Sequence, residues 1–404
     1  MIPRKRLDLA WSDLIAGFGY CLTCASRRSL EARLEQTWAK GEASLICLSV
    51  RSGFDALLQT LKLEPGDEIL VSAVTIRGMT RIIEAHGLVP VPLDVDFTRL
   101  AVRPEAMAEA VTERTRAMLV AHLFGSRMPM EPVLSFARAH RLLVIEDCAQ
   151  AYAGKQYRGH PESDVCLFSF GPIKTTTALA GGILQFRDAA LCEAVRDCQE
   201  QWPVQSRLRF LRRLLKYALL MLLSYRATYS FFVGLCSMLK LNHDVIISKS
   251  VRGFAGDGFF ERIRQQPSAA LLALLDRRIQ QFNPERIVER TRLAEQLNQL
   301  APALRQPGSQ AFNHTHWVFP ILCDDPKSLM HYLWREGFDA TQGGSSLYVV
   351  EPPANRPGLE PIAAKQAFGQ LLYLPLYPGM SSADVARLAW ALNEYAKTDA
   401  ETRG

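Results

Sequence analysis

The sequence predicts an α/β fold with a mainly parallel sheet that is covered on both faces. Short apolar runs recur from about residue 45, and most are separated by an interval long enough for a helix. These runs are β-branched or continuously apolar, as expected for strands that are buried on both faces. The 404 residues are 48% hydrophobic and 22% charged, close to the globular average, which excludes a disordered or fibrous chain.

Seven apolar runs are the predicted strands of this sheet. They are Leu45–Val50, Glu68–Ser72, Val89–Val95, Ala117–Leu123, Leu142–Glu146, Cys166–Phe170 and Gly182–Phe186. Pro90 and Pro92 indicate that the third run lies at an edge or a strand entry, because proline cannot donate to a neighbouring strand. Pro104–Val111 predicts a helix, since proline is tolerated in the first turn.

After residue 265 the pattern becomes helical and predicts a smaller α+β domain. Its expected elements are the helices Ala269–Phe282, Arg286–Leu300, Lys327–Gly337 and Ser382–Ala396 and the strand Trp317–Cys323. We therefore divide the chain into a large domain (1–206), an insertion (207–257) and a helical linker with a C-terminal domain (258–404).

The insertion holds most of the net charge of +6. Five basic residues occur within residues 205–216 without an acid: Arg207, Arg209, Arg212, Arg213 and Lys216. The rest of the chain is nearly neutral, so a broad nucleic-acid-binding face is not expected.

The run Tyr217–Leu239 carries one charge, Arg226, and is long enough for a membrane span. A charge near the middle of a span costs about 2.5–3.5 kcal/mol, and a span would also separate the two halves of the core. An interfacial helix or helical hairpin at residues 207–241 fits better and predicts a peripheral membrane contact. The alternative is a helical pair packed on the protein's own surface or across a dimer interface.

Cysteine usage indicates a reducing compartment. The nine cysteines are an odd number, and several lie in apolar runs: Cys47, Cys148 and Cys166. Cys21 and Cys24 form a lone C-x-x-C pair without further ligands, so no metal is expected. Asp8 and Asp13 interrupt the N-terminal apolar stretch, which argues against an export signal and for a cytoplasmic protein.

The residues that carry chemistry lie between 144 and 182. Asp147 follows one predicted strand, and Ser169 and Lys174 belong to the end of another. The carboxyl edge of a parallel sheet is where such folds bind ligands, and a desolvated lysine there can attack a carbonyl. An acid, a lysine and a hydroxyl are what pyridoxal phosphate needs. On spacing alone, Asp147 could equally cap a helix and Lys174 could be a solvated loop residue.

The surrounding strings resemble the DegT/DnrJ/StrS family of nucleotide-sugar aminotransferases, which have the fold-type-I architecture and use pyridoxal phosphate. The matching strings are Ser52–Leu57 (S-G-T-x-A-L in the family), Glu64–Glu68 (P-G-D-E), Pro92–Asp96 (V-D-I-D), Thr112–Ala117 (T-P-R-T-K-A), Ala121–Gly125 (V-H-L-Y-G), Ile145–Ala151 (I-E-D-A-A-Q-A), Phe168–Lys174 with Gly181–Gly182 (S-F-x-x-x-K and G-G), and Leu374–Pro378 (L-P-L-Y-P). The likeness covers about residues 45–190 and, more weakly, 258–396.

This resemblance implies roles for individual residues. Lys174 would be the Schiff-base lysine and proton shuttle, Asp147 would pair with the pyridine nitrogen, and Gln150 would lie near the ring. Ser169 and the amides at a helix N-terminus would hold the phosphate, the amides being those of Gly53, Phe54 and Asp55. Some relatives carry His in place of the lysine and dehydrate instead, so Lys174 favours transamination.

Three positions depart from the family pattern. Phe54 replaces a threonine of the phosphate turn, and Ile76 stands where the family stacks an aromatic residue on the cofactor. The string Gly258–Arg262 lacks the family's Asn but keeps Arg262, in a segment that reaches a neighbouring subunit's cofactor in the family. A homodimer is therefore expected.

The predicted function is a pyridoxal-phosphate aminotransferase that converts a keto-sugar, on a nucleotide, to an amino sugar with glutamate as donor. A lipid-linked or membrane-held ketone is the alternative substrate, motivated by the insertion. A non-catalytic scaffold that retains the fold is a third hypothesis. His122 and Arg51 are weaker site candidates, which a structural histidine and a solvated arginine would explain equally well.

Overall fold

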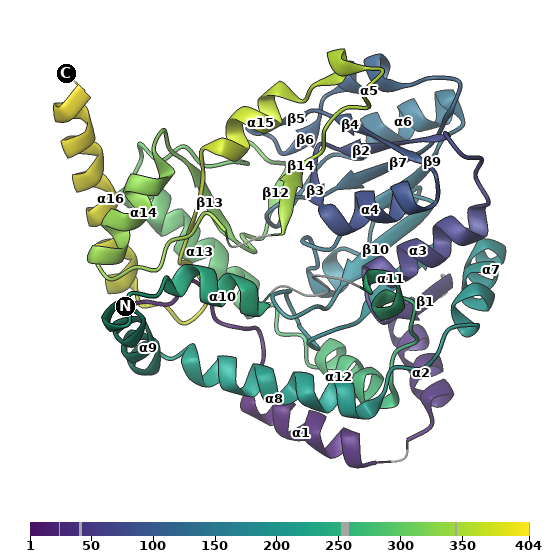
Figure 1. Cartoon of the computed structure of the whole chain (residues 1–404), viewed down its shortest axis with the longest axis horizontal. Coiled ribbons are helices and arrows are strands. Elements are labelled where there is room, and N and C mark those ends of the chain that lie inside the picture. Colours follow the sequence, from purple (N-terminus) through teal and green to yellow (C-terminus); the bar gives the residue numbers. More distant parts are fainter. Residues whose placement is uncertain (24, 40–42, 252–257, 344–345, 404) are drawn as a thin grey trace.

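The computed structural model describes residues 1–23, 25–39, 43–251, 258–343 and 346–403. Cys24 of the C-x-x-C pair and residues 252–257 of the insertion lie outside these ranges. Within the described ranges the chain forms a seven-stranded sheet flanked by helices, followed by a smaller C-terminal part (Figure 1). The predicted α/β architecture is confirmed.

The main sheet is mixed, with a parallel centre. Its strands, in spatial order, are β1 (Ala43–Cys47), β11 (Gly182–Phe186), β10 (Val165–Ser169), β9 (Leu143–Asp147), β7 (Thr115–Ala121), β2 (Glu68–Ser72) and β4 (Val89–Leu93). Strands β10, β9, β7, β2 and β4 pair in parallel, and β11 pairs antiparallel with both of its neighbours. β4, which carries Pro90 and Pro92, is an edge strand, as the prolines predict.

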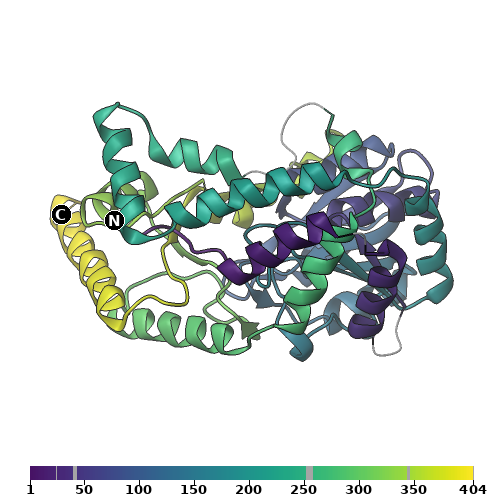
Figure 2. The same cartoon turned by 90° about the horizontal axis from the view of Figure 1, so that it is seen from below.

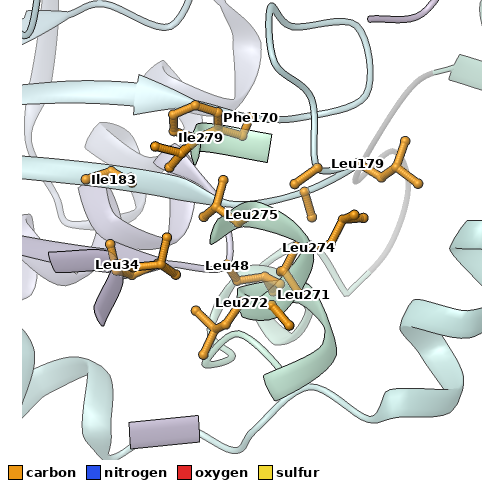
Figure 3. Packing of buried hydrophobic residues seen from close by; sticks show 14 of the residues in the cluster. Leu34, Leu48, Phe170, Leu179, Ile183, Leu271, Leu272, Leu274, Leu275 and Ile279 are labelled. Atoms are coloured by element: carbon orange, nitrogen blue, oxygen red, sulfur yellow. The ribbon is translucent and has the colours of Figure 1, made fainter. Parts of the chain in front are cut away.

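Alternate residues of these strands face two different helical layers. One layer contains α3 (Val50–Leu61), α4 (Arg77–Ala85) and α7 (Ala189–Glu200); the other contains α2 (Arg27–Ala39), α5 (Pro104–Ala110), α6 (Glu131–His140) and α12 (Ala269–Gln280). Leu167 packs in the first layer and Phe168 in the second, as the two-residue period of a strand requires. Figure 3 shows leucines of α12 beside Leu48 and Ile183 in the second layer.

The predicted strand Leu45–Val50 was too long. β1 ends at Cys47, and Val50 already begins α3. Ser49 ends the extended backbone because its side-chain oxygen accepts a hydrogen bond from the Ser52 amide, which caps the helix.

The C-terminal part has a core of its own. It contains α13 (Glu285–Leu300), α14 (Pro326–Arg335), α16 (Ser382–Arg403) and the antiparallel pair β13 (Phe319–Leu322) and β15 (Leu371–Leu374). Ile2, from the start of the chain, packs in the same core. β14 (Leu347–Val349) pairs with β3 (Val74–Ile76) in a separate two-stranded sheet, and β3 directly follows β2 of the main sheet in the sequence.

The insertion forms helices α8 (Arg207–Leu223), α9 (Arg226–Met238) and α10 (His243–Val251), and α11 (Phe259–Ile263) follows it. α8 runs beside α1 (Trp11–Leu22) along one side of the molecule (Figures 1 and 2). In the described part of the chain no single helix is long and apolar enough to cross a membrane. Only α8 and α9 together pass that test by length and composition, and they bend by 92° at their break.

α8 has three distinct faces. One face is buried against the core and carries Phe210, Leu214, Tyr217 and Met221. A second face is exposed and apolar and carries Leu208, Leu215, Leu219 and Leu222. Arg209, Arg212, Arg213 and Lys216 lie between these two faces, on the side that faces the cavity described next, whereas Arg207 does not line that cavity.

Candidate active site

The ends of two neighbouring strands frame a cavity of about 450 Å³. Asp147 is the last residue of β9 and Ser169 the last of β10, and these strands pair in parallel. Their carboxyl ends therefore meet at one edge of the sheet. Asp147, Gln150, Ser169 and Lys174 all line this cavity, so the structure brings together four residues that the sequence singled out.

Lys174 lies in the loop that follows β10 and is half-buried at the cavity. Its amide donates a hydrogen bond to the Gly171 carbonyl, and the neighbouring Ile173 carbonyl accepts one from the indole N–H of Trp317 at 2.9 Å. The Lys174 Nζ lies 4.3 Å from the centroid of the Trp317 ring. Burial, together with the charge of Arg51, lowers the pKa of Lys174 to about 8, although Asp147 acts in the opposite direction.

Asp147 is held at the same cavity by the backbone that follows it. Its Oδ1 accepts a hydrogen bond from the Ala149 amide at 2.9 Å. Burial raises the pKa of Asp147, whereas that amide and the Lys174 charge oppose the rise. A cationic ligand group beside this carboxylate would favour its ionised form.

Gln150 and two further predicted residues, Ile76 and Arg262, line other parts of the cavity. Gln150 accepts a hydrogen bond from the Phe124 amide at 2.8 Å, which fixes its side-chain oxygen. Ile76 comes from β3 and Arg262 from α11. Arg262 thus lies in the cavity of its own chain, whereas the resemblance implies a segment that reaches the neighbouring subunit.

The three residues predicted to hold a phosphate through their amides lie further inside α3 than expected. The Gly53 amide donates to the Ser49 carbonyl at 3.1 Å, so it already belongs to the helical hydrogen-bond pattern. Gly53 is needed for packing instead: a Cβ there would meet the Leu184 side chain at 2.4 Å. Phe54 is fully buried in the apolar layer beneath the helix.

Asp55 points away from the cavity. Its carboxylate accepts hydrogen bonds from Arg264 at 2.8 Å and from Gln59 at 3.1 Å, and its Oδ1 lies 3.0 Å from His86 Nε2. Burial opposes ionisation, but the hydrogen bonds from His86 and Arg264 hold the pKa of Asp55 below its usual value. This ion pair removes the conflict between an aspartate and a bound anion.

The N-terminus of α3 nevertheless faces the cavity. Ser49, Val50 and Arg51 line it, and the first-turn amides of a helix have no partner within the helix. An anion at this position would meet the N–H groups of Val50 and Arg51, one turn earlier than the sequence predicted. Arg51 itself is buried rather than solvated, and burial together with Arg213 lowers its pKa to about 10.

The basic residues of α8 form another wall of this cavity. They are Arg209, Arg212, Arg213 and Lys216. Burial, and the charge of Arg209, lower the pKa of Arg213, while burial and Arg213 lower that of Lys216. Asp147 is the one acid among the described residues that line the cavity. The sequence predicts these cations at a membrane interface, whereas in the structure they line the cavity. The periodicity of one helix does not reveal what each of its faces contacts.

His122 lies outside this cavity, in a buried network around Glu146. Its Nδ1 accepts from the Met128 amide, so Nε2 carries the proton and donates to Glu146 at 2.8 Å. Tyr157 also donates to Glu146, whose second oxygen accepts from Ser163. His122 and Glu146 come close to Cys148 in a group with metal-ligand chemistry, but these hydrogen bonds occupy their ligand atoms. The structural interpretation of His122 is therefore favoured.

This residue set fits pyridoxal phosphate, the cofactor that the resemblance implies. The cavity combines a half-buried lysine of lowered pKa, a carboxylate at a strand end, and a helix N-terminus beside Arg51 and Ser169. The lysine could bind the cofactor's carbonyl, the carboxylate its protonated ring nitrogen, and the helix N-terminus its phosphate. No described group in the cavity contradicts the fit.

The sequence profile of the DegT/DnrJ/EryC1/StrS aminotransferase family matches residues 26–220. This segment, slightly less than half of the chain, is similar to that family. The resemblance read from the individual strings is thus confirmed over the segment that contains Asp147, Ser169 and Lys174.

Two curated proteins match less than half of the chain. The UDP-4-amino-4-deoxy-L-arabinose–oxoglutarate aminotransferase of Shewanella sediminis is 32% identical over 168 residues, or 41% of this chain and 42% of the relative. The erythromycin biosynthesis sensory transduction protein EryC1 of Saccharopolyspora erythraea is 36% identical over 157 residues, or 37% of this chain and 43% of the relative. The chain thus matches less than half the length of these curated relatives.

The fold extends the likeness to the whole chain. The crystal structure of the aminotransferase TlmJ from Streptoalloteichus hindustanus superposes with a TM-score of 0.71 at 20% identity and covers 100% of both chains. The predicted fold-type-I architecture is confirmed, including the C-terminal part, where the sequence likeness is weak.

Proposed function

We propose that this protein is a pyridoxal-phosphate-dependent aminotransferase that converts a keto-sugar to an amino sugar, with glutamate as the amino donor. The observation that carries the proposal is the half-buried Lys174, whose pKa is lowered to about 8 by desolvation, in one cavity with Asp147. One relative is named as an aminotransferase for a nucleotide-linked amino sugar and the other as a protein of erythromycin biosynthesis, and the first name supports a sugar as the substrate.

Each residue of the cavity then has a role. Lys174 would bind the cofactor's carbonyl, and Asp147 would hold its ring nitrogen protonated. Ser169, Arg51 and the first-turn amides of α3 would bind its phosphate, and Gln150 and Ile76 would lie against the ring. Arg262 adds positive charge at the same cavity.

When bound, the cofactor supplies an electron sink for breaking a bond at the carbon that bears the amino group. This chain supplies the proton transfers. A lysine amine with a pKa of about 8 exchanges its proton readily near neutral pH. Asp147 would stabilise the positive charge of the protonated ring nitrogen. Its burial would strengthen that interaction because the local dielectric is low.

The carrier of the sugar is proposed to be a nucleotide. The α8 cations support a phosphorylated carrier, because Arg209, Arg212 and Lys216 add positive charge beyond what one cofactor phosphate neutralises.

A lipid-linked substrate is the second candidate. Beyond Lys216 the same side of α8 continues with Leu220 and Leu223, which line an apolar cavity next to Lys174. An anionic head group on an aliphatic chain would match this order of charged and then apolar side chains.

We further infer a homodimer, and a cytoplasmic protein held peripherally on the membrane by residues 207–241. Exposed apolar side chains support the membrane contact: Leu215, Leu219, Leu222, Phe231 and Met238. Positive charge of α8 near an anionic leaflet would add to it.

The test begins with purified protein and added cofactor. A visible absorption band that Lys174→Ala abolishes is expected, followed by amino transfer from glutamate to a keto-sugar nucleotide. Wild-type protein without a band would support the scaffold hypothesis instead. Transfer to a lipid-linked ketone, but not to nucleotide-linked ones, would favour the second candidate.

The α8 cations can be tested separately. Arg212→Met should raise KM for the phosphorylated sugar, whereas Arg207→Met, on the same helix but outside the cavity lining, should not.

A further inference from the structure

A second cavity adjoins the one described above. It has a volume of about 170 Å³ and shares Ile173, Lys174, Trp317 and Leu347 with the first. Its walls are mostly apolar, with contributions from α8, from α9 and from the C-terminal part: Leu220, Leu223, Phe232, Tyr373, Leu374 and Leu376. Six cations and Asp8 also line it, and two of these cations, Lys5 and Arg290, have buried nitrogen atoms without a hydrogen-bond partner among the described residues.

Lys5 ends in this cavity without a hydrogen-bond partner among the described residues. Its Nζ is fully buried and lies 4.2 Å from the centroid of the Trp317 ring, the ring that Lys174 also contacts. The chain around it is fixed: the Ile2 amide donates to the Gly337 carbonyl at 2.7 Å, and Arg4 pairs with Asp339 at 2.6 Å.

Arg290, from α13, is the second cation. Its Nη1 donates to Thr175 Oγ1 at 3.2 Å, directly beside Lys174. Its Nε and Nη2 are buried and have no partner within the described residues. Unpaired N–H groups of a buried guanidinium are costly, so this arrangement is expected only where a ligand completes it.

Apart from Lys174, the other charged groups at this cavity have partners of their own. Asp8 is the acid whose charge acts on Lys5, but it binds Arg278 and Arg286, both at 3.1 Å, and accepts from the Thr176 amide at 2.9 Å. Arg4 pairs with Asp244 and Asp339, and Arg6 lies over the Tyr225 ring.

The two unpaired cations repel each other. Burial, then Arg290 and Lys174, lower the pKa of Lys5 well below its usual value. Burial lowers the pKa of Arg290 to about 10. An anion between them would relieve both the repulsion and the missing hydrogen bonds.

We propose that Lys5 and Arg290 form the subsite that binds a carboxylate of the amino donor. This inference rests on the proposed aminotransferase function and assigns the donor's place within it. A dicarboxylic amino acid matches the cavity, because its carboxylate can accept hydrogen bonds from the three unpartnered nitrogen atoms, Lys5 Nζ and Arg290 Nε and Nη2, while its short aliphatic chain contacts the apolar walls. The shared residues place this donor beside Lys174.

The test is a calorimetric titration of the cofactor-loaded protein with glutarate, a dicarboxylate that has no amino or keto group and cannot react. Wild-type protein should bind glutarate. Lys5→Met and Arg290→Met should each weaken binding by about 10- to 100-fold, as expected when a charge-assisted hydrogen bond is lost. Arg292→Met is the matched control, because Arg292 is exposed on the same helix, and it should bind like the wild type.

Thermal unfolding without ligand separates binding from a structural role. Lys5→Met should unfold at the same or a higher temperature than the wild type, since it removes an unpaired buried charge. Lys5→Gln and Arg290→Lys serve as milder variants if a methionine variant does not fold.

Unchanged glutarate affinity in folded Lys5 and Arg290 variants would overturn the subsite. A clear preference for inorganic phosphate over glutarate would also overturn it. If the cofactor's visible absorption band is normal, either result contradicts only the subsite and not the proposed aminotransferase function. A wild-type protein without the band contradicts the proposed function itself, and the cofactor-free protein can then still be titrated with glutarate.

Discussion

The Nζ of Lys174 lies 4.3 Å from the centroid of the Trp317 indole ring. Trp317 belongs to the C-terminal part and Lys174 to the loop after β10, so this contact joins two parts of the chain that are 143 positions apart in the sequence. The indole N–H also binds the Ile173 carbonyl. The C-terminal part therefore fixes both the backbone and the side chain of the candidate lysine.

Trp317→Phe tests this positioning. The variant keeps an aromatic face for the ammonium group but leaves the Ile173 carbonyl without its donor, so the free energy of unfolding should fall by about 1–3 kcal/mol. Urea unfolding measures this loss. Cofactor capture should slow in the same variant, and full retention of both properties would show that the indole N–H does not position the loop.

The lowered pKa of Lys174 predicts how cofactor capture depends on pH. An amine attacks a carbonyl only when it is unprotonated, and the pKa of Lys174 is about 8 because of burial. The rate of capture by cofactor-free protein should therefore rise from pH 6.5 to about pH 8 and level off above it, as followed by stopped-flow absorbance. A rate that keeps rising to about pH 10 would indicate an ordinary, solvated lysine.

The same pKa shift affects stability. A folded-state pKa below the unfolded value means that the unfolded chain binds more protons between about pH 8 and 10.5. The contribution of Lys174 to the free energy of unfolding should therefore increase with pH across this window. Lys174→Met should flatten the pH dependence there.

Asp147→Asn removes the charge proposed to stabilise the cofactor's ring nitrogen. Turnover should fall by orders of magnitude while the fold is retained, since a charge that acts in the transition state is lost. Asp197→Asn, at an exposed position of α7, is the control. Steady-state kinetics and circular dichroism of both variants suffice, and near-normal turnover of Asp147→Asn would remove its role.

Flotation with anionic-lipid vesicles tests the membrane contact. Deleting residues 207–241 would also remove a cavity wall, so exposed positions are substituted instead. Phe231→Ser with Met238→Ser, which are both 74% exposed, should reduce the floating fraction severalfold at low salt. Ser237→Ala is the matched control on α9. Equal recovery of wild type and double variant in the soluble fraction would leave a protein–protein interface as the explanation of the exposed side chains.

Much of the sheet could be predicted because its strands are uniformly apolar. Glu68–Ser72 and Gly182–Phe186 match β2 and β11 residue for residue. The helices α1 and α2 were not predicted: α2 carries weak apolar periodicity, and the basic residues before α1 resembled the start of a targeting segment.

The candidate site was predictable where a residue lies at a strand end. Asp147, Ser169 and Lys174 were found because parallel strands bring their carboxyl ends together. Lys5, Arg290 and Trp317 were missed because they reach the cavity only through tertiary packing across more than 100 residues of sequence. A lysine in a short N-terminal segment and an arginine within a polar helix carry no local signal of burial.

The most direct test of the central claim is borohydride reduction of the cofactor-loaded protein followed by peptide mass mapping. The account predicts that the cofactor becomes fixed to the peptide that contains Lys174. Label on the exposed Lys155, on Lys5 or on any other lysine, with Lys174 unmodified, would contradict the assignment of the active site.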